Sequence, residues 1–264
     1  MRILHVIPSL SGRAGGPAKV VRELSETLVR LGEKVSIYTT DHGWNEPLSD
    51  GVVTEKDGVE IKLFKREWPE RYFYSPLLGK ELKRSIRDFD IVHIHGLWTY
   101  PTLTASRAAQ RWEVPYIIRP CGMLDSYCLA HHKFRKTVYH FFLERYHLQS
   151  AEAIHFTTEE EKERSVTGAL ASRSVVVPLG LRTEDYAHLP PPGSFRSQFQ
   201  NLDGRKIIAF LGRISFKKGL DVLIEAFSEL LEESKGIHCV IAGPDDEGYG
   251  KKLVRWIREK GIGD

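Results

Sequence analysis

Two cationic side chains lie in a short turn of the stretch "FLGRISFKKGLDVLIEAF", residues 210–227. Gly212 ends an apolar run, Arg213 and Lys218 follow, and apolar residues then recur at helical spacing. In open α/β sheets, ligands bind beyond the carboxyl ends of the strands, where helix N-termini offer free N–H groups. Two fixed cations beside such donors match a diphosphate better than a single carboxylate. The turn is a candidate phosphate site; the alternative is a solvated loop whose charges serve solubility.

A second turn, "SLSGRAGGPAKVV" at residues 9–21, also joins an apolar run to a helical pattern. Gly15 and Gly16 allow a ligand to approach the backbone closely, and Pro17 suits the first turn of a helix. The unpaired N–H groups of that helix end would favour an anionic group. The spacing G-x-G-x-x-G is absent, so a dinucleotide site is not indicated. A plain strand-to-helix turn is the alternative.

The segment "DIVHIHGLW" at residues 90–98 places His93 and His95 two residues apart in a predicted strand. Their side chains therefore share one face of that strand. His95, directly before Gly96, lies nearer the carboxyl end and is the candidate for substrate contact. Two imidazoles could begin a metal site, but the sequence shows no third ligand nearby. We therefore predict no metal site and expect hydrogen bonding or substrate contact instead.

The segment "VPYIIRPCGMLDSYCL" places Arg119, Cys121 and Gly122 at the end of another predicted strand. Cys121 raises the hypothesis of a thiol nucleophile. No histidine or aspartate stands at a diagnostic spacing from it, and a single cysteine is more often a small buried apolar residue. We therefore disfavour covalent thiol catalysis.

The composition excludes several classes of protein. The chain has 264 residues with 38 basic and 35 acidic side chains, so its net charge of +3 argues against wholesale binding of nucleic acid. Three cysteines cannot all pair, which favours a reducing, cytoplasmic compartment. No run of about 18 apolar residues occurs, so no membrane-spanning helix is predicted.

The elements that must position these turns alternate between strand and helix patterns. Strands are predicted at residues 2–7, 34–40, 59–64, 90–95, 115–119, 153–157, 174–178, 206–212 and 237–243. Helices are predicted at residues 17–31, 76–88, 101–113, 131–148, 220–233 and 248–260, with a further one from Glu159. This alternation, with strands apolar on both faces, predicts an α/β fold with a doubly wound parallel sheet.

Residues 179–203 lack periodicity and contain three consecutive prolines, which is typical of a linker. We therefore expect a domain at residues 1–178, a linker at 179–203 and the start of a second βαβα unit at 204–264. That unit is shorter than the usual domain of about 100–150 residues, and we expect it to be cut short.

Two other segments carry conspicuous charge. The predicted helix "HHKFRKTVYHFFLERYHLQ" combines basic and aromatic side chains, which could meet a membrane surface or a lipid-linked acceptor at the inner face of the membrane. A buried apolar face with a solvated basic side is the alternative. In "TTEEEKERS", Thr158 and Glu161 have the spacing of a capping box, so we interpret these glutamates as structural.

Six segments together resemble the retaining glycosyltransferases of family 4, which have two Rossmann-like domains in the GT-B arrangement. They are "GGPAKVVRELSETLVRLGEKVSIYTT", "DIVHIHGLW", "VPYIIRPCGMLD", "VVVPLGL", "FLGRISFKKGLDVLIEAF" and "CVIAGPDDEGYG". The resemblance implies transfer of a sugar from a nucleoside diphosphate sugar to a glycan or glycolipid acceptor, in polysaccharide or surface-glycan biosynthesis. It implies no obligatory metal or cofactor.

The resemblance also assigns roles to residues. Arg213 and Lys218 would neutralise the departing diphosphate beside Gly212, and Gly15 and Gly16 would lie near the phosphates or the acceptor. It implies that the N-terminal domain binds the acceptor and that the C-terminal domain binds most of the nucleotide.

Two departures from the family pattern stand out. Cys121 occupies the position where many relatives have a histidine facing the transferred sugar, so either His95 or Arg119 would share that role or the activity would be altered. The paired glutamates of the family have no counterpart, because Glu225 and Glu233 have the spacing without the glycine-rich context. The alternatives are an inactive module that binds an acceptor or partner and, less favoured, a nucleotide-sugar epimerase.

Overall fold

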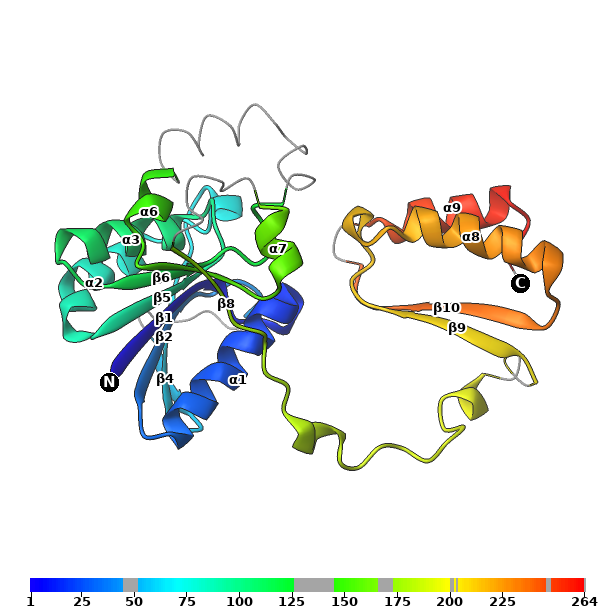
Figure 1. Cartoon of the computed structure of the whole chain (residues 1–264), viewed down its shortest axis with the longest axis horizontal. Coiled ribbons are helices and arrows are strands. Elements are labelled where there is room, and N and C mark those ends of the chain that lie inside the picture. Colours follow the sequence, from blue (N-terminus) through cyan, green and yellow to red (C-terminus); the bar gives the residue numbers. More distant parts are fainter. Residues whose placement is uncertain are drawn as a thin grey trace. The chain divides into compact units, whose positions relative to one another are not determined.

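A computed structural model describes residues 1–44, 52–125, 145–165, 173–199, 202, 204–245 and 248–263. The chain divides into two compact units, Met1–Arg182 and Thr183–Asp264, which are described separately below (Figure 1). No helix among the described residues is long and apolar enough to cross a membrane. The predicted helix at 131–148 is described only from residue 145 onward, so most of it and Cys128 lie outside the described residues.

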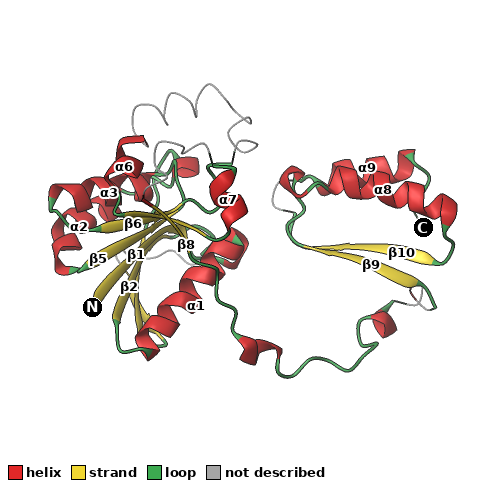
Figure 2. Cartoon of the chain, in the orientation of Figure 1, coloured by secondary structure: helices red, strands yellow, loops and turns green. Residues whose placement is uncertain are grey.

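Unit 1 contains one sheet with the strand order β3-β4-β2-β1-β5-β6-β7-β8 (Figure 2). The strands are β1 (Arg2–Ser9), β2 (Lys34–Thr40), β3 (Val52–Lys56), β4 (Val59–Phe64), β5 (Ile91–His95), β6 (Tyr116–Arg119), β7 (Ala153–Phe156) and β8 (Ser174–Val176). All neighbours are parallel except β3 and β4. This order reverses at β1, where β2 pairs on one side and β5 on the other.

One edge of the sheet departs from the predicted parallel arrangement. β3 is antiparallel to β4 and was not predicted as a strand. The two are joined by Asp57 and Gly58, both with positive φ of 53° and 76°. Asp-Gly between two strands is a strong hairpin signal, because this turn needs left-handed backbone at both positions. The polar side chains of Glu55 and Lys56 are exposed, which obscured the strand pattern.

Helices cover both faces of this sheet and make two separate cores (Figure 1). They are α1 (Gly16–Arg30), α2 (Pro76–Ser85), α3 (Tyr100–Arg111), α6 (Arg145–Ser150) and α7 (Glu159–Glu163). α1 packs through Val21 on the face formed by Ile7, Ile37 and Ile61. α2, α3 and α6 pack on the opposite face, where Leu82 and Ile94 are fully buried. The strands are therefore apolar on both faces, as a doubly wound sheet requires.

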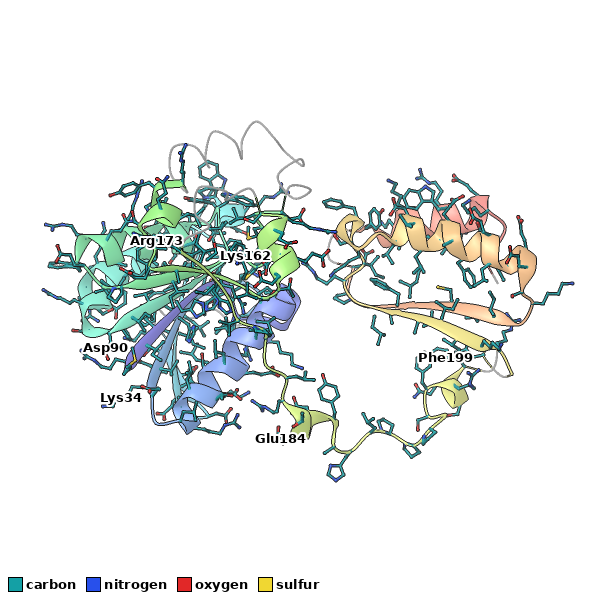
Figure 3. All side chains as sticks on the ribbon, in the orientation of Figure 1. Lys34, Asp90, Lys162, Arg173, Glu184 and Phe199 are labelled. Atoms are coloured by element: carbon teal, nitrogen blue, oxygen red, sulfur yellow. The ribbon has the colours of Figure 1, made fainter. Side chains whose placement is uncertain are left out.

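The edge strand β8 is tied to the rest of unit 1 by a side chain. Arg173, which is labelled in Figure 3, lies directly before β8. Its Nη1 donates to the carbonyl oxygen of Ala151 at 2.9 Å. β8 then pairs with β7. The sheet thereby brings the carboxyl ends of β1, β5, β6 and β7 to one edge, where the loops with Gly15, His95 and Cys121 begin.

Unit 2 contains the parallel pair β9 (Lys206–Leu211) and β10 (Ile237–Ala242) with α8 (Leu220–Glu233) and α9 (Gly250–Glu259). Both helices lie on the same side of the two strands (Figure 2). Their core is formed by Leu220, Ile224 and Leu253, which are at most 4% exposed. The bounds of α8 agree with the sequence prediction.

Candidate active site

The turn after β1 ends in an exposed helix N-terminus. A short 3-10 turn at Gly12–Ala14 leads to Gly15, whose φ of 76° favours glycine. α1 begins at Gly16 with Pro17 in its first turn, and no side chain caps its N–H groups. A side chain at Gly16 would meet nothing within 4 Å. The first turn of α1 therefore offers backbone donors and a positive dipole end to an anionic group.

The Glu161 carboxylate, interpreted from the sequence as part of a helix cap, also holds the turn after β6. Cys121 and Gly122 both have positive φ, 56° and 73°. Gly122 N–H donates to Glu161 Oε1 on α7 at 2.7 Å, and Glu161 Oε2 accepts from both N–H and Oγ1 of Thr157. Thr158 still caps α7 through Glu161 N–H at 3.0 Å. The glutamate therefore fixes the backbone of the turn that is expected to face the sugar.

Arg119 is buried at the end of β6, with 2% of its surface exposed. Its Nε donates to Cys121 Sγ at 3.3 Å. Its Nη1 is buried without a hydrogen-bond partner within the described part of the chain. Burial raises the pKa of the Cys121 thiol, with Arg119 acting in the opposite direction. A protonated thiol is a poor nucleophile, which agrees with the expectation against covalent catalysis.

The predicted histidine pair is part of a larger cluster on β1, β5 and β7. His5 Nδ1 and His95 Nε2 are 2.9 Å apart, and both residues are 1% exposed. His93 lies beside them, with ring centroids 5.3 Å from His5 and 4.2 Å from His95. His155 Nδ1 approaches His93 Nε2 at 3.4 Å. His5 pairs with His93 in register only because β1 and β5 are adjacent, so no local sequence signal revealed it.

Burial keeps the imidazoles of His5, His93 and His95 neutral. It lowers the pKa of His5 to about 3, with Arg119 contributing, and lowers the pKa of His95 well below its ordinary value. The structure brings His95, Arg119 and Cys121 together: His95 pairs with Arg119 in register, and Gly96 N–H donates to the Arg119 carbonyl at 2.9 Å. The imidazole of His95 faces His5 rather than open solvent, so its predicted contact with substrate stays a prediction.

The turn after β9 presents the two predicted cations. Arg213 and Lys218 are exposed, and neither has an ion-pair partner among the residues that the structure describes. Phe216–Lys218 form a 3-10 turn closed by Lys218 N–H to the Ser215 carbonyl at 3.0 Å. Gly219, with φ of 63°, then starts α8, whose N–H groups have no side-chain cap. The cations therefore stand beside free helix donors, an arrangement suited to phosphate oxygens.

A glycine that sequence reasoning missed supports this turn. Gly212 N–H donates to the Ala242 carbonyl at 3.0 Å, and Ile214 N–H donates to the Pro244 carbonyl at 2.9 Å. A Cβ on Gly243 would lie 1.8 Å from the Gly212 carbonyl oxygen. The two strand ends can approach this closely only with glycine at 243. The late segment "IAGPD" held that signal, since a glycine after a strand often marks a close backbone approach.

The glutamates with family-like spacing do not join a site in unit 2. Glu225 is largely exposed and pairs with Lys260 Nζ at 2.7 Å, joining α8 to the end of α9. Glu233 ends α8 and is exposed. Their placement agrees with the interpretation of a solvated face.

Two family models match this arrangement of turns and sheets. The "Glycosyl transferase 4-like domain" matches residues 15–180, and "Glycosyl transferases group 1" matches residues 194–264. The chain belongs to the glycosyl transferase 4-like family. The predicted family is therefore confirmed, on a match that covers well over half of the chain.

Curated relatives of this family share modest identity with the chain. It is 26% identical over 258 residues to the D-inositol 3-phosphate glycosyltransferase of Kineococcus radiotolerans, covering 90% of this chain and 58% of the relative. It is 28% identical over 253 residues to the enzyme of the same name from Xylanimonas cellulosilytica, covering 88% and 59%. The chain therefore spans somewhat under two thirds of the length of these relatives.

Solved structures agree in fold. The Anabaena protein HepE in complex with UDP and glucose matches with a TM-score of 0.71 at 14% identity, covering 100% of this chain and 67% of that one. Sucrose-phosphate synthase from Thermosynechococcus elongatus matches with a TM-score of 0.71 at 16% identity, covering 100% and 68%. These structural similarities confirm that the chain has the predicted GT-B fold.

Proposed function

We propose that this chain acts in the transfer of a sugar from a nucleoside diphosphate sugar to an acceptor, with retention at the anomeric carbon. One observation carries the proposal: Arg213 and Lys218 are exposed and without ion-pair partners among the described residues, beside the uncapped N-terminus of α8. Family membership supports it, and HepE is solved with UDP-glucose. No metal or cofactor is required by this proposal.

The chemistry of the turn follows from charge. When the sugar leaves the donor, negative charge grows on the diphosphate, and preorganised cations stabilise that charge more than they stabilise the ground state. Arg213 offers a planar fork to two phosphate oxygens, whereas Lys218 acts as a point charge. The N–H groups at the start of α8 add fixed dipoles, and Gly212 lies directly before Arg213 at the end of β9.

Unit 1 is the proposed acceptor side. The residues expected to line it lie at or just beyond the carboxyl ends of β1, β5 and β6: Gly15, Gly16, His95, Arg119, Cys121 and Gly122. The relatives are named for D-inositol 3-phosphate, and the uncapped N-terminus of α1 suits an acceptor that carries an anionic group. A glycan or lipid-linked acceptor for polysaccharide or surface-glycan synthesis in the cytoplasm remains the proposed wider setting.

Contact with the inner face of a membrane is proposed on sequence alone, because residues 131–144 lie outside the described part. Sedimentation with anionic vesicles, compared with neutral vesicles, tests it. Equal recovery in the supernatant with both vesicle types would contradict the contact.

Donor binding is the direct test of the proposed function. Thermal stabilisation of the chain should occur with UDP-sugars or GDP-sugars and with the free nucleoside diphosphates, and less with the monophosphates. Arg213→Ala and Lys218→Ala should weaken it. Lys206→Ala is the matched control, since Lys206 is an exposed cation at the opposite end of the same strand. No stabilisation by any nucleoside diphosphate would overturn the proposal.

A transfer assay, run beside the thermal measurement, tests the alternative of an inactive binding module. Donor binding without release of the nucleoside diphosphate, at any acceptor supplied, would favour the module. Transfer of radiolabelled sugar to an acceptor would favour the enzyme.

A further inference from the structure

Three imidazoles converge at the point where the strand order of unit 1 reverses. His5 comes from β1, and His93 and His95 come from the adjacent strand β5. One ring nitrogen from each lies within 4.8 Å of the others. We propose that His5, His93 and His95 bind one transition-metal ion of the kind that prefers imidazole, such as Zn²⁺. The site is separate from the proposed donor site and does not depend on it.

The backbone already holds the three side chains in place. His5 and His93 are directly paired in register, and His95 follows His93 on the same face of β5. Zn–N bonds are about 2.0–2.1 Å, so the three nitrogens must approach within roughly 3.5 Å of one another. His5 Nδ1 and His95 Nε2 are already 2.9 Å apart, and one nitrogen of each of the three rings lies within 4.8 Å of the others, so shifts of roughly 1 Å would complete the ligand set.

The polar atoms of the cluster are incompletely satisfied. His5 Nε2 and His95 Nδ1 are buried with no hydrogen-bond partner in the described part of unit 1. They are not the nitrogens that would bind the ion. Those are the facing atoms His5 Nδ1 and His95 Nε2, which share one proton across 2.9 Å, and the ion would replace that proton. Burial also keeps the imidazoles neutral at pH 7, which is the form that binds metal.

A fourth histidine fits the role of an outer partner. His155 Nε2–H donates to the Val177 carbonyl at 2.8 Å, so the neutral ring has its lone pair on Nδ1. That lone pair accepts from His93 Nε2–H at 3.4 Å, which leaves Nδ1 of His93 free to bind. Histidines that ligate metals usually donate their other ring N–H to a fixed acceptor, which orients the ring.

Arg119 opposes the metal and gives a sharp test. Its guanidinium is close enough to lower the pKa of all three imidazoles, and it adds positive charge beside a neutral ligand set. The affinity should therefore rise when this charge is removed. Arg119→Gln should tighten binding several-fold, a change that no surface histidine site would show.

The experiment measures Zn²⁺ binding to the full chain. The protein is stripped with chelator, refolded with and without Zn²⁺, dialysed, and its bound metal is counted; Co²⁺ replaces Zn²⁺ for visible spectroscopy. We expect one ion per chain, held by the three imidazoles with a water molecule as the fourth ligand, and an intense Co²⁺ spectrum of four-coordinate type. His5→Gln, His93→Gln and His95→Gln should each lower the affinity by more than tenfold, and His155→Gln by about tenfold.

Two histidines outside the cluster serve as controls. His147 is buried on α6 and His188 is exposed in unit 2, so His147→Gln and His188→Gln should bind as the wild type does. If a cluster variant fails to fold, ¹⁵N shifts of the wild-type imidazoles with and without Zn²⁺ decide the matter. No stoichiometric metal after refolding, or no change in the shifts of the three cluster imidazoles, would overturn the site and leave a purely hydrogen-bonded array.

Discussion

Glu161 and Gly122 are joined by a short hydrogen bond between α7 and the turn after β6. Gly122 N–H donates to Glu161 Oε1 at 2.7 Å, although the residues are 39 positions apart in the sequence. The second carboxylate oxygen accepts from Thr157 N–H at 2.8 Å and from Thr157 Oγ1 at 2.7 Å. One carboxylate therefore satisfies donors of two loops at the edge of the sheet where the acceptor is proposed to bind.

Replacing Glu161 by alanine should destabilise unit 1 by about 2–4 kcal/mol, because three donors to a charged acceptor lose their partner. Urea unfolding checks this value. Glu159→Ala and Glu160→Ala are matched controls on the same helix, since those carboxylates are 67% and 69% exposed in simple i,i+3 and i,i+4 pairs. Both should change stability by less than about 0.5 kcal/mol. Equal effects at all three positions would contradict the bridging role.

The sequence predicted elements whose signals are local. α8 was predicted with its observed bounds because its apolar period is clear and Gly219 precedes it. The capping of α7 by Thr158 was also readable. The acceptor of Gly122 was not, because Glu161 reaches it across the sheet edge and the capping pattern gave the carboxylate another role.

The missed features depend on strands that are distant in sequence. His5 meets His93 and His95 only because β1 and β5 are neighbours, and Gly243 meets Gly212 only because β9 and β10 are neighbours. The strand β3 was missed for another reason. Asp57 and Gly58 are a local signal for a hairpin, but the exposed polar residues of β3 hide the apolar pattern of a strand. These contacts of the candidate site depend on which strands pair with each other. A short stretch of sequence does not contain that information.

Gly243→Ala should disrupt the turn after β9, where the diphosphate is proposed to bind. The added Cβ would lie 1.8 Å from the Gly212 carbonyl oxygen, so the strand ends must separate. We expect a loss of about 3 kcal/mol, seen as roughly 100-fold faster amide exchange in β9 and β10.

Gly236→Ala is the control for Gly243→Ala, because it introduces backbone strain without a steric collision. Gly236 also has positive φ, 81°, but a Cβ there would meet nothing within 4 Å. It should therefore cost only about 1 kcal/mol. Similar exchange in the two variants would show that the close approach at Gly212 does not hold the turn.

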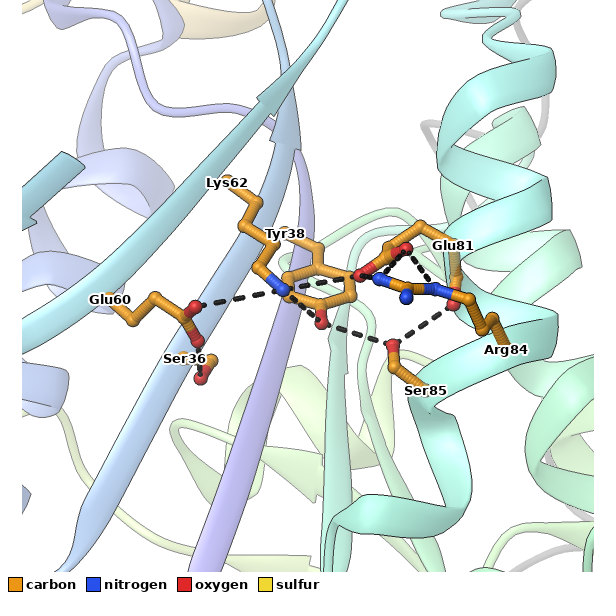
Figure 4. A network of polar contacts seen from close by, with 7 residues as sticks. All are labelled: Ser36, Tyr38, Glu60, Lys62, Glu81, Arg84 and Ser85. Carbon is orange, nitrogen blue, oxygen red and sulfur yellow. Dashed lines mark hydrogen bonds and ion pairs between the residues drawn. The ribbon is translucent and has the colours of Figure 1, made fainter. Parts of the chain in front are cut away.

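Lys62 links β4 to α2 through a network of polar contacts (Figure 4). Its Nζ lies 3.1 Å from Glu81 Oε1, 3.6 Å from Glu60 Oε1 and 3.3 Å from the Tyr38 hydroxyl. The Lys62 and Glu81 side chains are 18% and 14% exposed, so Lys62→Met removes the less exposed of the two cations that contact a largely enclosed carboxylate and leaves only the exposed Arg84. We expect a loss of about 1–3 kcal/mol in urea unfolding.

The exposed Lys56→Met is the control for Lys62→Met and should be nearly neutral. Adding Glu81→Gln to Lys62→Met should recover part of the loss, because it removes the enclosed charge that has lost Lys62 and keeps only the exposed Arg84 as a partner. A double variant less stable than the sum of the single variants would contradict this account.

His147 should make unit 1 less stable in mild acid. Burial, with Arg107 contributing, lowers the pKa of His147 to about 4, and Gln110 Nε2 donates to its Nδ1 at 3.2 Å. The unfolded chain takes up a proton near pH 6.5, whereas the folded chain does not. Stability from this group is therefore complete above about pH 6.5 and falls as the pH drops towards 4, by about 2 kcal/mol at pH 5.

Comparison of wild type with His147→Gln isolates this contribution from that of other histidines. The stability difference between pH 7 and pH 5 should be smaller in the variant by about 2 kcal/mol, measured by urea unfolding at both pH values. An unchanged difference would mean that His147 titrates alike in the folded and unfolded chain.

Arg213→Ala and Lys218→Ala should each reduce sugar transfer by about 10²–10³-fold, if transfer is the activity of the chain. The loss should fall mainly on kcat, because the cations meet charge that grows as the diphosphate leaves. Arg213→Lys keeps the charge but not the fork, so it should recover only part of the rate. Lys206→Ala, at the other end of β9, should leave the rate unchanged. An Arg213→Ala or Lys218→Ala variant with wild-type kcat would remove that side chain from the proposed diphosphate site, whereas a rise in KM alone would restrict it to ground-state binding of the donor.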